Sequence, residues 1–335
     1  MAARDVRRRP TVRRTGTARP SQRGAALLTA MIIVTLVATL AASMVWQQWR
    51  AVQVEGAERA RAQSAWILAG ALDWARLILK EDARSAANPV DHLGEPWAVP
   101  LAEARLSTFL AVDQSNTDDA PDAFLSGVIT DAQSKFNVTN LLKADGTPDE
   151  DQLLVLTRLC EATGISSDAA TRILSGLVAI KAAAKNPSAT TPLTPSTVAQ
   201  LTWLGVPADA VKALSPYIIV LKTPTNINMN TAPREVVFAA VKAFDLGQAE
   251  RFLQTRAKKH FNSTAALQGA LPPNFDMAKA KLSVNSSFFE VRGRLRLGTR
   301  VLEQISLVER RRAGNQPDIV VLHRERVSSL DQPAS

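Results

Sequence analysis

Three kinds of hydrophobic pattern follow one another along the chain. The first is an apolar stretch from Ala25 to Trp49, AALLTAMIIVTLVATLAASMVWQQW, which holds no charged residue. At about 1.5 Å per residue, a helix from Ala25 to Val45 spans about 30 Å, the thickness of the hydrocarbon core of a bilayer. The pattern therefore predicts a membrane-crossing helix, with Trp46 and Trp49 placed where interfacial aromatic residues belong.

The helical pattern continues beyond this apolar stretch. No proline occurs between Pro20 and Pro89, and apolar residues recur at spacings of three and four. We therefore expect one helix from about Ala25 to about Lys80, whose second half lies against a soluble domain. The residues taken to continue the spacing are Trp66, Ala69, Leu72, Asp73 and Leu77.

Strand patterns flank a long helical block. Short β-prone runs, ARLSTFLAV and FLSGVIT, occur between residues 104 and 137, and Val291, Leu295 and Leu297 alternate with arginines before two further candidate strands, TRVLEQISLVERR and PDIVVLHRERV. Helical spacing dominates between them. Because an isolated strand pair is marginal in water, we expect the strands before residue 140 and after residue 283 to form one antiparallel sheet packed on the long helix.

These patterns predict an α+β fold in six segments. The helical block is expected to be an all-helical insertion that interrupts the sheet. The segments are a basic leader (1–24), the N-terminal helix (25–80, membrane-spanning over 25–46), the first part of an α/β domain (81–140), the helical insertion (141–272), the second part of the sheet (273–326) and a disordered tail (327–335).

The charge of the chain is concentrated ahead of the apolar helix. The net charge is +9, and residues 1–24 hold eight Arg against one Asp. By the positive-inside rule this tail stays in the cytoplasm, and the chain after about residue 46 lies on the other side of the membrane. The alternative is a cleaved secretory signal peptide, cut near Ala42 and Ser43. The length of the apolar stretch and the unbroken helical pattern argue against it.

Few side chains suggest catalysis or metal binding. The histidines, His92, His260 and His323, lie far apart and show no metal-ligand spacing, and Cys160 is the single cysteine. We expect Cys160 to be a small core residue rather than a nucleophile. The sequence therefore favours a protein that is not an enzyme and requires no cofactor.

The start of the apolar helix resembles a known processing signal. A basic leader and Arg23-Gly24 directly before an apolar helix resemble the signal of type IV pilins and type II secretion pseudopilins. The resemblance implies that a prepilin peptidase recognises Arg23 and Gly24, cuts between Gly24 and Ala25, and N-methylates Ala25. Most members carry Glu five residues into the mature helix, where this chain has Thr29. Its absence is typical of the K-type minor subunit; the alternative is that Thr29 only bonds back to a helix carbonyl.

Further stretches resemble the K-type pseudopilins, namely residues 61–84, 91–101, 127–142 and 225–237. The resemblance implies a pilin-like fold whose insertion is a helix-hairpin-helix or SAM-like module. It also implies a minor pseudopilin at the pseudopilus tip that initiates and caps assembly for export of folded proteins across the outer membrane. The location is then the bacterial inner membrane, with a single pass, a cytoplasmic N-terminus and a periplasmic C-terminal domain.

The resemblance also implies partners. They are the I- and J-type minor pseudopilins, the G- and H-type pseudopilins, prepilin peptidase, the inner-membrane platform and membrane lipid. Small and apolar residues of the membrane helix are expected to carry lateral association. The expected assembly face comprises Leu27, Leu28, Ala30, Met31, Val34, Ala38 and Ala41.

One motif leaves a rival interpretation open. The segment NINMNTAPREVV, with Asn228, Asn230, Thr231 and Pro233, resembles the helix-hairpin-helix of DNA-binding proteins, with Thr231 as a helix N-cap and Pro233 in the first turn. The rival is a membrane-anchored DNA receptor of a type IV or competence pilus. Pro207 removes an amide donor from the expected hairpin turn, and the block carries little positive charge. We therefore expect a packing module and no nucleic acid.

An acidic loop offers candidate calcium ligands. Asp118, Asp119 and Asp122, with Asp113 nearby, could supply carboxylate oxygens. Members of the family bind calcium in their soluble domains, so the resemblance makes calcium a candidate ligand. The loop has no EF-hand spacing, and a solvated acidic loop remains the alternative.

Overall fold

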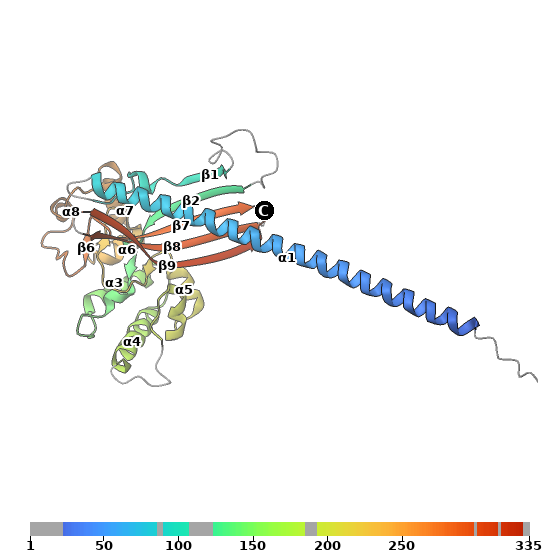
Figure 1. Ribbon diagram of the computed structural model, residues 1–335. Helices are drawn as coiled ribbons and strands as arrows, with labels where there is room; N and C mark the ends of the chain where they lie inside the picture. Colours follow the sequence, from blue (N-terminus) through green and yellow to red (C-terminus); the bar gives the residue numbers. More distant parts are fainter. Residues whose placement is uncertain are drawn as a thin grey trace, which may run out of the picture. The chain divides into compact units, whose positions relative to one another are not determined.

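The computed structural model describes residues 23–85, 90–106, 123–184, 193–297, 300–313 and 316–330 (Figure 1). The chain divides into two compact units, Met1–Gln63 and Ser64–Ser335. Helix α1 (Arg23–Ser85) is unbroken, as its pattern predicted. Within the first unit, the described residues from Ala25 to Trp49 are all exposed. An apolar helix with exposed side chains is typical of a segment surrounded by lipid rather than of a helix in a soluble core.

In the second unit, α1 packs on the sheet through a stripe that shares Leu72 with the residues expected from spacing but not Trp66 or Leu77. Leu68, Leu72, Ala75 and Leu79 are buried, whereas Trp66 and Leu77 are 79% and 55% exposed. The buried residues stand at i, i+4, i+7 and i+11, so they share one helix face. Apolar residues occupy two faces of this helix, and spacing alone does not tell which one meets the sheet.

A five-stranded antiparallel sheet forms the other layer. Its order is β1-β2-β7-β8-β9, which confirms that strands before residue 140 and after residue 283 share one sheet. The strands are β1 (Leu101–Arg105), β2 (Ala123–Asp131), β7 (Phe288–Leu297), β8 (Arg300–Ala313) and β9 (Gln316–Leu330). β9 runs four residues past the expected boundary at residue 326, because residues 327–330 pair with β8. Most of the expected run 104–112 lies outside the described residues.

The core between α1 and the sheet is compact. It contains Leu72, Leu79 and Trp97, and opposite them Phe289 and Val308 from the sheet. Trp97 belongs to the short 3-10 helix η1 (Pro96–Ala98) and meets Phe289 edge-on with ring centroids 5.2 Å apart. Large apolar side chains removed from water on both layers hold the second half of α1 against the strands.

A helical insert lies between β2 and β7, and Figure 1 shows its helices gathered near one end of the sheet. It has its own hydrophobic core, which includes Leu156, Ile173, Leu214 and Val237. Side chains of Asp149, Asp245 and Ser263 cap three of its helices. The helices are α3 (Glu150–Ala162), α4 (Asp168–Ala183), α5 (Ala208–Leu214), α6 (Arg234–Ala240), α7 (Leu246–Lys258) and α8 (Thr264–Ala270), with the 3-10 helix η4 (Val198–Leu204).

The prediction of an all-helical insert is wrong in one respect. Two short parallel strand pairs tie the insert together: β3 (Phe136–Asn137) pairs with β4 (Ile218–Ile219), and β5 (Ile227–Asn228) pairs with β6 (Leu282–Ser283). Strands of two residues are too short to show alternation, so no sequence pattern could reveal them. Short 3-10 helices η2 (Ala132–Ser134) and η3 (Val138–Leu141) complete the entry into the insert.

Candidate functional site

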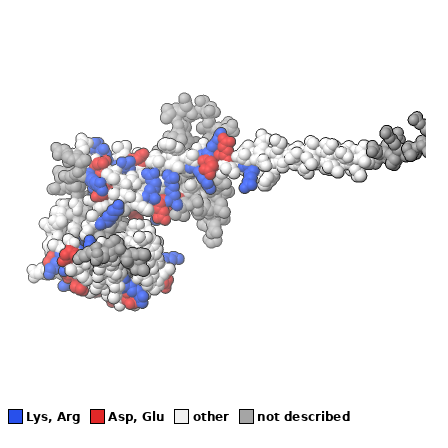
Figure 2. Space-filling model, turned by 60° about the horizontal axis from the view of Figure 1, so that its bottom comes forward, with Lys and Arg blue, Asp and Glu red and all other residues white. Residues whose placement is uncertain are grey.

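The apolar part of α1 is long enough to cross a membrane, and it satisfies its own side-chain hydroxyls. The hydroxyls of Thr29, Thr35, Thr39 and Ser43 each donate to a backbone carbonyl three or four residues earlier, at 2.8–2.9 Å. In Figure 2 this stretch carries no acidic or basic residue. A segment without charges or unpaired hydroxyls is suited to hydrocarbon, where an unsatisfied polar group is expensive.

The residues of the expected processing signal lie at the start of this helix. Arg23 and Gly24 stand in the first turn of α1, and Ala25 and Thr29 follow with exposed side chains. Thr29 donates to the carbonyl of Ala25, which is the bond that the alternative interpretation foresaw. The residues of the expected assembly face are likewise exposed: Leu27, Leu28, Ala30, Met31, Val34, Ala38 and Ala41.

A second exposed apolar face occurs on α1 in the soluble unit. Trp66, Gly70 and Leu77 stand at i, i+4 and i+11, opposite the stripe that meets the sheet. Trp66 is 79% exposed and Leu77 55% exposed. A Cβ added at Gly70 would meet no atom within 4 Å. The face thus presents two large apolar side chains on either side of a position where another backbone could come close.

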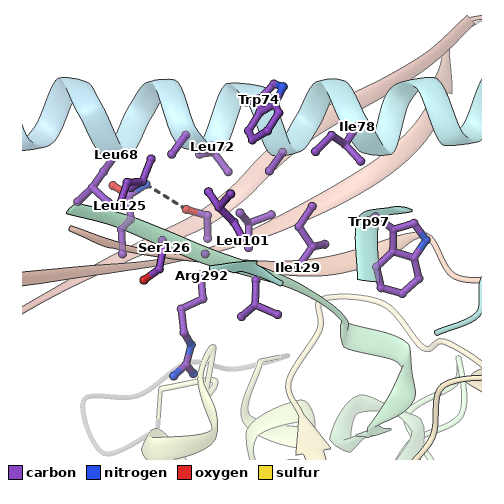
Figure 3. Close-up of a pocket in the computed structure, with 18 of the residues that line it drawn as sticks. Leu68, Leu72, Trp74, Ile78, Trp97, Leu101, Leu125, Ser126, Ile129 and Arg292 are labelled. Carbon is purple, nitrogen blue, oxygen red and sulfur yellow. Dashed lines mark hydrogen bonds between the residues drawn. The ribbon is translucent and has the colours of Figure 1, made fainter. Parts of the chain in front are cut away.

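An apolar cleft of about 80 Å³ lies on the other side of the helix, between α1 and the sheet. In Figure 3 Leu72, Trp74 and Ile78 line it from the helix, and Leu101 and Ile129 line it from the strands. Buried Gln304 and Ser306 form part of its floor and are hydrogen-bonded to each other at 3.4 Å. Because the floor polar atoms are paired, the cleft is suited to an apolar side chain.

Three separate sequence segments meet in a buried polar junction around Asp131. Its Oδ2 accepts hydrogen bonds from Thr231 Oγ1 (2.5 Å), Ser286 Oγ (2.6 Å) and Asn228 Nδ2 (2.9 Å), and its Oδ1 accepts one from Gln133 N (2.8 Å). Burial raises the pKa of Asp131 to about 6, although the four donors favour its ionised form. The carboxylate fastens the insert to the end of β2.

The junction continues to α1 and β8 through Asp91. Asp91 is buried and accepts from Ser286 N at 2.7 Å and from the Arg310 guanidinium at 2.6 Å, while its carbonyl accepts from Asn228 Nδ2 at 3.0 Å. Arg310 Nη1 also donates to Asp82 of α1 at 3.0 Å. The chain of contacts from α1 through Arg310 and Asp91 to Asn228 links all three parts of the soluble unit.

A further carboxylate adjoins this network. Glu95 Oε2 accepts from His92 N at 2.8 Å and from Trp97 Nε1 at 2.7 Å. Burial, reinforced by the nearby charges of Asp82 and Asp91, raises the pKa of Glu95 to about 7. Burial is also the main reason that the pKa of Asp82 is raised, against the opposing effect of Arg310.

The motif NINMNTAPREVV is placed differently from its expected local role. Helix α6 begins at Arg234 with Pro233 as the N-cap residue, so the prediction that Thr231 caps it and that Pro233 lies in its first turn is wrong. The helix begins three residues after Thr231, and the Thr231 hydroxyl donates to the buried carboxylate of Asp131 instead of capping α6. Asn230 bonds both ways with Phe261, at 3.0 and 2.9 Å.

The carboxylates that could hold a metal differ from those that the sequence suggested. The calcium candidates Asp118, Asp119 and Asp122, with Asp113, lie outside the described residues. Asp82, Asp91 and Glu95 place ligand oxygens within 4.8 Å of one another. The guanidinium of Arg310 binds two of these three carboxylates, so it already supplies the positive charge that a cation would bring.

The remaining candidates take structural positions. Cys160 is buried in the core of the insert, and burial raises the pKa of its thiol, which disfavours the reactive thiolate.

The turn before α5 has Gly205 at φ +78°, a conformation that favours glycine. Pro207 supplies no amide to a phosphate there. Sequence reasoning missed Asp91, Asp131, Ser286 and Arg310 as one cluster, because they lie far apart in the sequence and no local pattern links them.

Two family models match residues within the insert. Both are described as "Type II secretion system (T2SS), protein K", and they match residues 134–223 and 227–285. These ranges contain Asn228, Asn230 and Thr231 of the buried junction.

Full-length relatives and a solved structure agree with these matches. The chain is 24% identical over 319 residues to the type II secretion system protein K of Pseudomonas aeruginosa, covering 88% of this chain and 91% of the relative. It is 29% identical over 320 residues to that of Klebsiella pneumoniae, covering 86% and 93%. A chain of the GspK-GspI-GspJ complex from the type 2 secretion system of enterotoxigenic Escherichia coli shares the fold, with a TM-score of 0.62 and 19% identity over 82% of this chain and 99% of that chain.

Proposed function

The chain belongs to the type II secretion system protein K family and is a minor pseudopilin of type II secretion, and on that premise we propose that it stands at the tip of the pseudopilus with I- and J-type minor pseudopilins. In this proposal it initiates assembly and caps the growing filament, whose extension exports folded proteins across the outer membrane. Its role is structural, without catalysis.

The exposed face of α1 formed by Trp66, Gly70 and Leu77 carries the proposal. Large apolar side chains left in water cost roughly 25 cal/mol per Å² of surface, and a helix from a partner would cover them. Gly70 would let that helix approach closely. The apolar cleft between α1 and the sheet, bordered by Trp74, offers room for an apolar side chain of a partner. A solved relative of the same fold comes from a complex that contains GspI and GspJ.

The membrane half of α1 supports anchoring in the bacterial inner membrane. The Arg-rich residues 1–24 orient the chain with the N-terminus in the cytoplasm and the soluble unit in the periplasm. Prepilin peptidase would cut between Gly24 and Ala25 and methylate Ala25. Leu27, Leu28, Ala30, Met31, Val34, Ala38 and Ala41 would then pack laterally on neighbouring pseudopilins, including G- and H-type subunits near the platform.

Thr29 and the insert together support a position at the tip. Thr29 carries no carboxylate, so it cannot neutralise the α-amino group of a neighbouring subunit in hydrocarbon, and that neighbour would remain costly to bury. The soluble unit would be a pilin-like domain widened by a helix-hairpin-helix or SAM-like insert. A subunit widened in this way would leave no room for another subunit above it.

Co-purification tests the proposal with full-length chains. The chain would be co-expressed with I- and J-type partners, extracted in mild detergent and recovered through a tag on this chain. The variant Trp66→Glu with Leu77→Glu should recover at least about tenfold less partner, since centrally placed apolar anchors carry most of the binding free energy. Trp203→Glu is the matched control, because Trp203 is a 51% exposed tryptophan on the insert. Equal recovery with both variants would refute the proposed face.

A further inference from the structure

The fold brings together two histidines that are far apart in the sequence. The imidazole rings of His92 and His260 stack with centroids 3.6 Å apart and planes 10° apart. His92 belongs to the turn before η1, and His260 follows the end of α7. This contact, which residue spacing gave no reason to expect, places two titratable rings face to face at the boundary between the insert and the α1 side.

The stacked pair forms one wall of a hollow of about 510 Å³. Arg256, Lys258 and Lys259 of the α7 end complete the charged part of its lining, with Asn230 on its floor, and no acidic residue lines it. Lys258 and Lys259 are exposed. Within the described part of the chain, neither ammonium group makes a hydrogen bond or an ion pair.

The acidic groups nearest to the hollow are committed elsewhere. Asp91 is held by Arg310 and Ser286 N, and the Glu95 carboxylate accepts from His92 N and Trp97 Nε1. The third acidic group, Asp82, also binds Arg310. The positive charge that faces the hollow is therefore not balanced by a carboxylate in the lining.

Arg256 differs from the two lysines because it is structural. Its Nη1 donates to the carbonyls of Met229 and Ala232 at 2.8 and 2.6 Å. Burial lowers the pKa of Arg256 to about 10, so it remains charged at neutral pH. Its charge adds to the field in the hollow, while Lys258 and Lys259 are the groups with donors to offer to a ligand.

The histidine pair makes this field dependent on pH. Burial, together with the neighbouring His260, lowers the pKa of His92. A second positive charge 3.6 Å from the first is unfavourable unless an anion lies beside both rings. An anion in the hollow would relieve that repulsion, and a proton on the pair would strengthen the attraction for the anion.

We propose that the hollow formed by His92, Lys258, Lys259 and His260 is a binding site for an anionic group, a carboxylate or a tetrahedral oxyanion, and that anion binding and protonation of the two imidazoles promote each other. The coupling is reciprocal by thermodynamic linkage: whatever factor protonation adds to anion affinity, the anion adds to proton affinity. The site is independent of the α1 face proposed for assembly.

The three histidines of the chain provide the test and its internal control. The full chain would be labelled at the histidine rings, held in detergent micelles and titrated from pH 8 to pH 5 by NMR. Inorganic sulfate is the first probe, because its charge is constant over this range, with sodium chloride at matched ionic strength as the blank. Sulfate should raise the apparent pKa of His92 and shift the ring resonances of His260, whereas those of His323 on β9, which does not line the hollow, should not respond.

Variants decide whether the hollow is responsible. Lys258→Gln with Lys259→Gln should weaken sulfate binding at pH 6 by about tenfold, equivalent to about 1.4 kcal/mol. Lys212→Gln with Lys222→Gln removes the same charge from exposed positions that do not line the hollow, and it should leave the affinity within about twofold. The same response of all three histidines, or the same affinity in both variants, would overturn the proposal.

A second probe separates the possible sources of the anion. A triglutamate peptide that binds more tightly than sulfate would assign the site to a protein carboxylate. Tighter binding of sulfate would assign it to a free or lipid-borne oxyanion. Either result supports an anion site, and binding of neither probe to His92 and His260 would reject it.

Discussion

Asn228 and Asp131 are 97 residues apart in the chain, yet Asn228 Nδ2 donates to Asp131 Oδ2 across 2.9 Å in the buried junction. The same amide nitrogen also donates to the carbonyl of Asp91 and to Ser286 Oγ. One side chain of the insert thus contacts both the end of β2 and the turn that follows α1. The junction therefore ties the insert to the rest of the soluble unit through polar contacts that are satisfied on every side.

Asp131→Asn should destabilise the soluble unit by about 2–4 kcal/mol, because an amide nitrogen cannot accept the bonds that Asp131 now accepts from Asn228, Ser286 and Thr231. Urea unfolding of the full chain in detergent, followed by tryptophan fluorescence, measures the change. Asp209→Asn is the control, since Asp209 is exposed in the first turn of α5, and it should cost no more than about 0.5 kcal/mol. Similar losses in both variants would remove the junction from its structural role.

Glu95 should make the unfolding free energy fall as the pH rises. Its pKa is raised to about 7 in the folded chain, from 4.5 as the ordinary value. Between these values the folded state binds more protons than the unfolded state, so stability present below about pH 4.5 is lost as the pH rises to about 7. Glu95→Gln keeps an acceptor for His92 N and Trp97 Nε1 without the charge. We expect it to be neutral at pH 5 and stabilising by an amount on the order of 1 kcal/mol at pH 8, since Glu95 is partly solvated.

Urea unfolding of wild type and Glu95→Gln at several pH values checks this expectation. The two curves of unfolding free energy against pH should meet near pH 5 and separate above it. A constant difference between them, or a larger one at low pH, would contradict the predicted ionisation of Glu95.

Two leucines on α1 test which face of the helix meets the sheet. Leu79 is fully buried, whereas Leu77 is 55% exposed. Leu79→Ala should cost about 2–5 kcal/mol of unfolding free energy, because it leaves a cavity against the strands. Leu77→Ala should change it by no more than about 0.5 kcal/mol. Thermal unfolding of the two variants in the same detergent compares them. A larger effect at Leu77 would mean that the face with Leu77, as expected from spacing, meets the sheet.

Cleavage at the start of α1 has a direct test by mass. In a host with prepilin peptidase, the mature chain should begin at Ala25 and carry one extra methyl group. Gly24→Val should abolish this processing, because a β-branched side chain blocks close approach to the backbone at the cut. Intact mass spectrometry of the membrane form measures both outcomes. A wild-type chain that begins at Met1 or near Ser43 would be incompatible with a prepilin signal.

Local sequence patterns predicted the helices and strands, but they did not predict contacts between residues far apart in the sequence. The unbroken helix and the strands at 288–297 and 300–313 follow from spacing within a few residues. The choice between Leu68 and Trp66 as the buried residue depends on which face the sheet covers. Thr231 is a plausible cap by its local sequence, but its hydroxyl donates a hydrogen bond to the carboxylate of Asp131, 100 residues away. The stacking of His92 on His260 is likewise decided by the tertiary fold.

The position of the insert in the sheet has an evolutionary consequence. It leaves the end of β2 and returns at the start of β7, and these two strands are neighbours in which Asp131 pairs with Phe289. The two ends of the insert therefore lie next to each other in the sheet. Helices can be lengthened, lost or exchanged inside it at a cost that grows only slowly with loop length, and the alignment of the five strands stays the same. The sequence of the insert can therefore diverge between relatives while the five-stranded sheet keeps its arrangement.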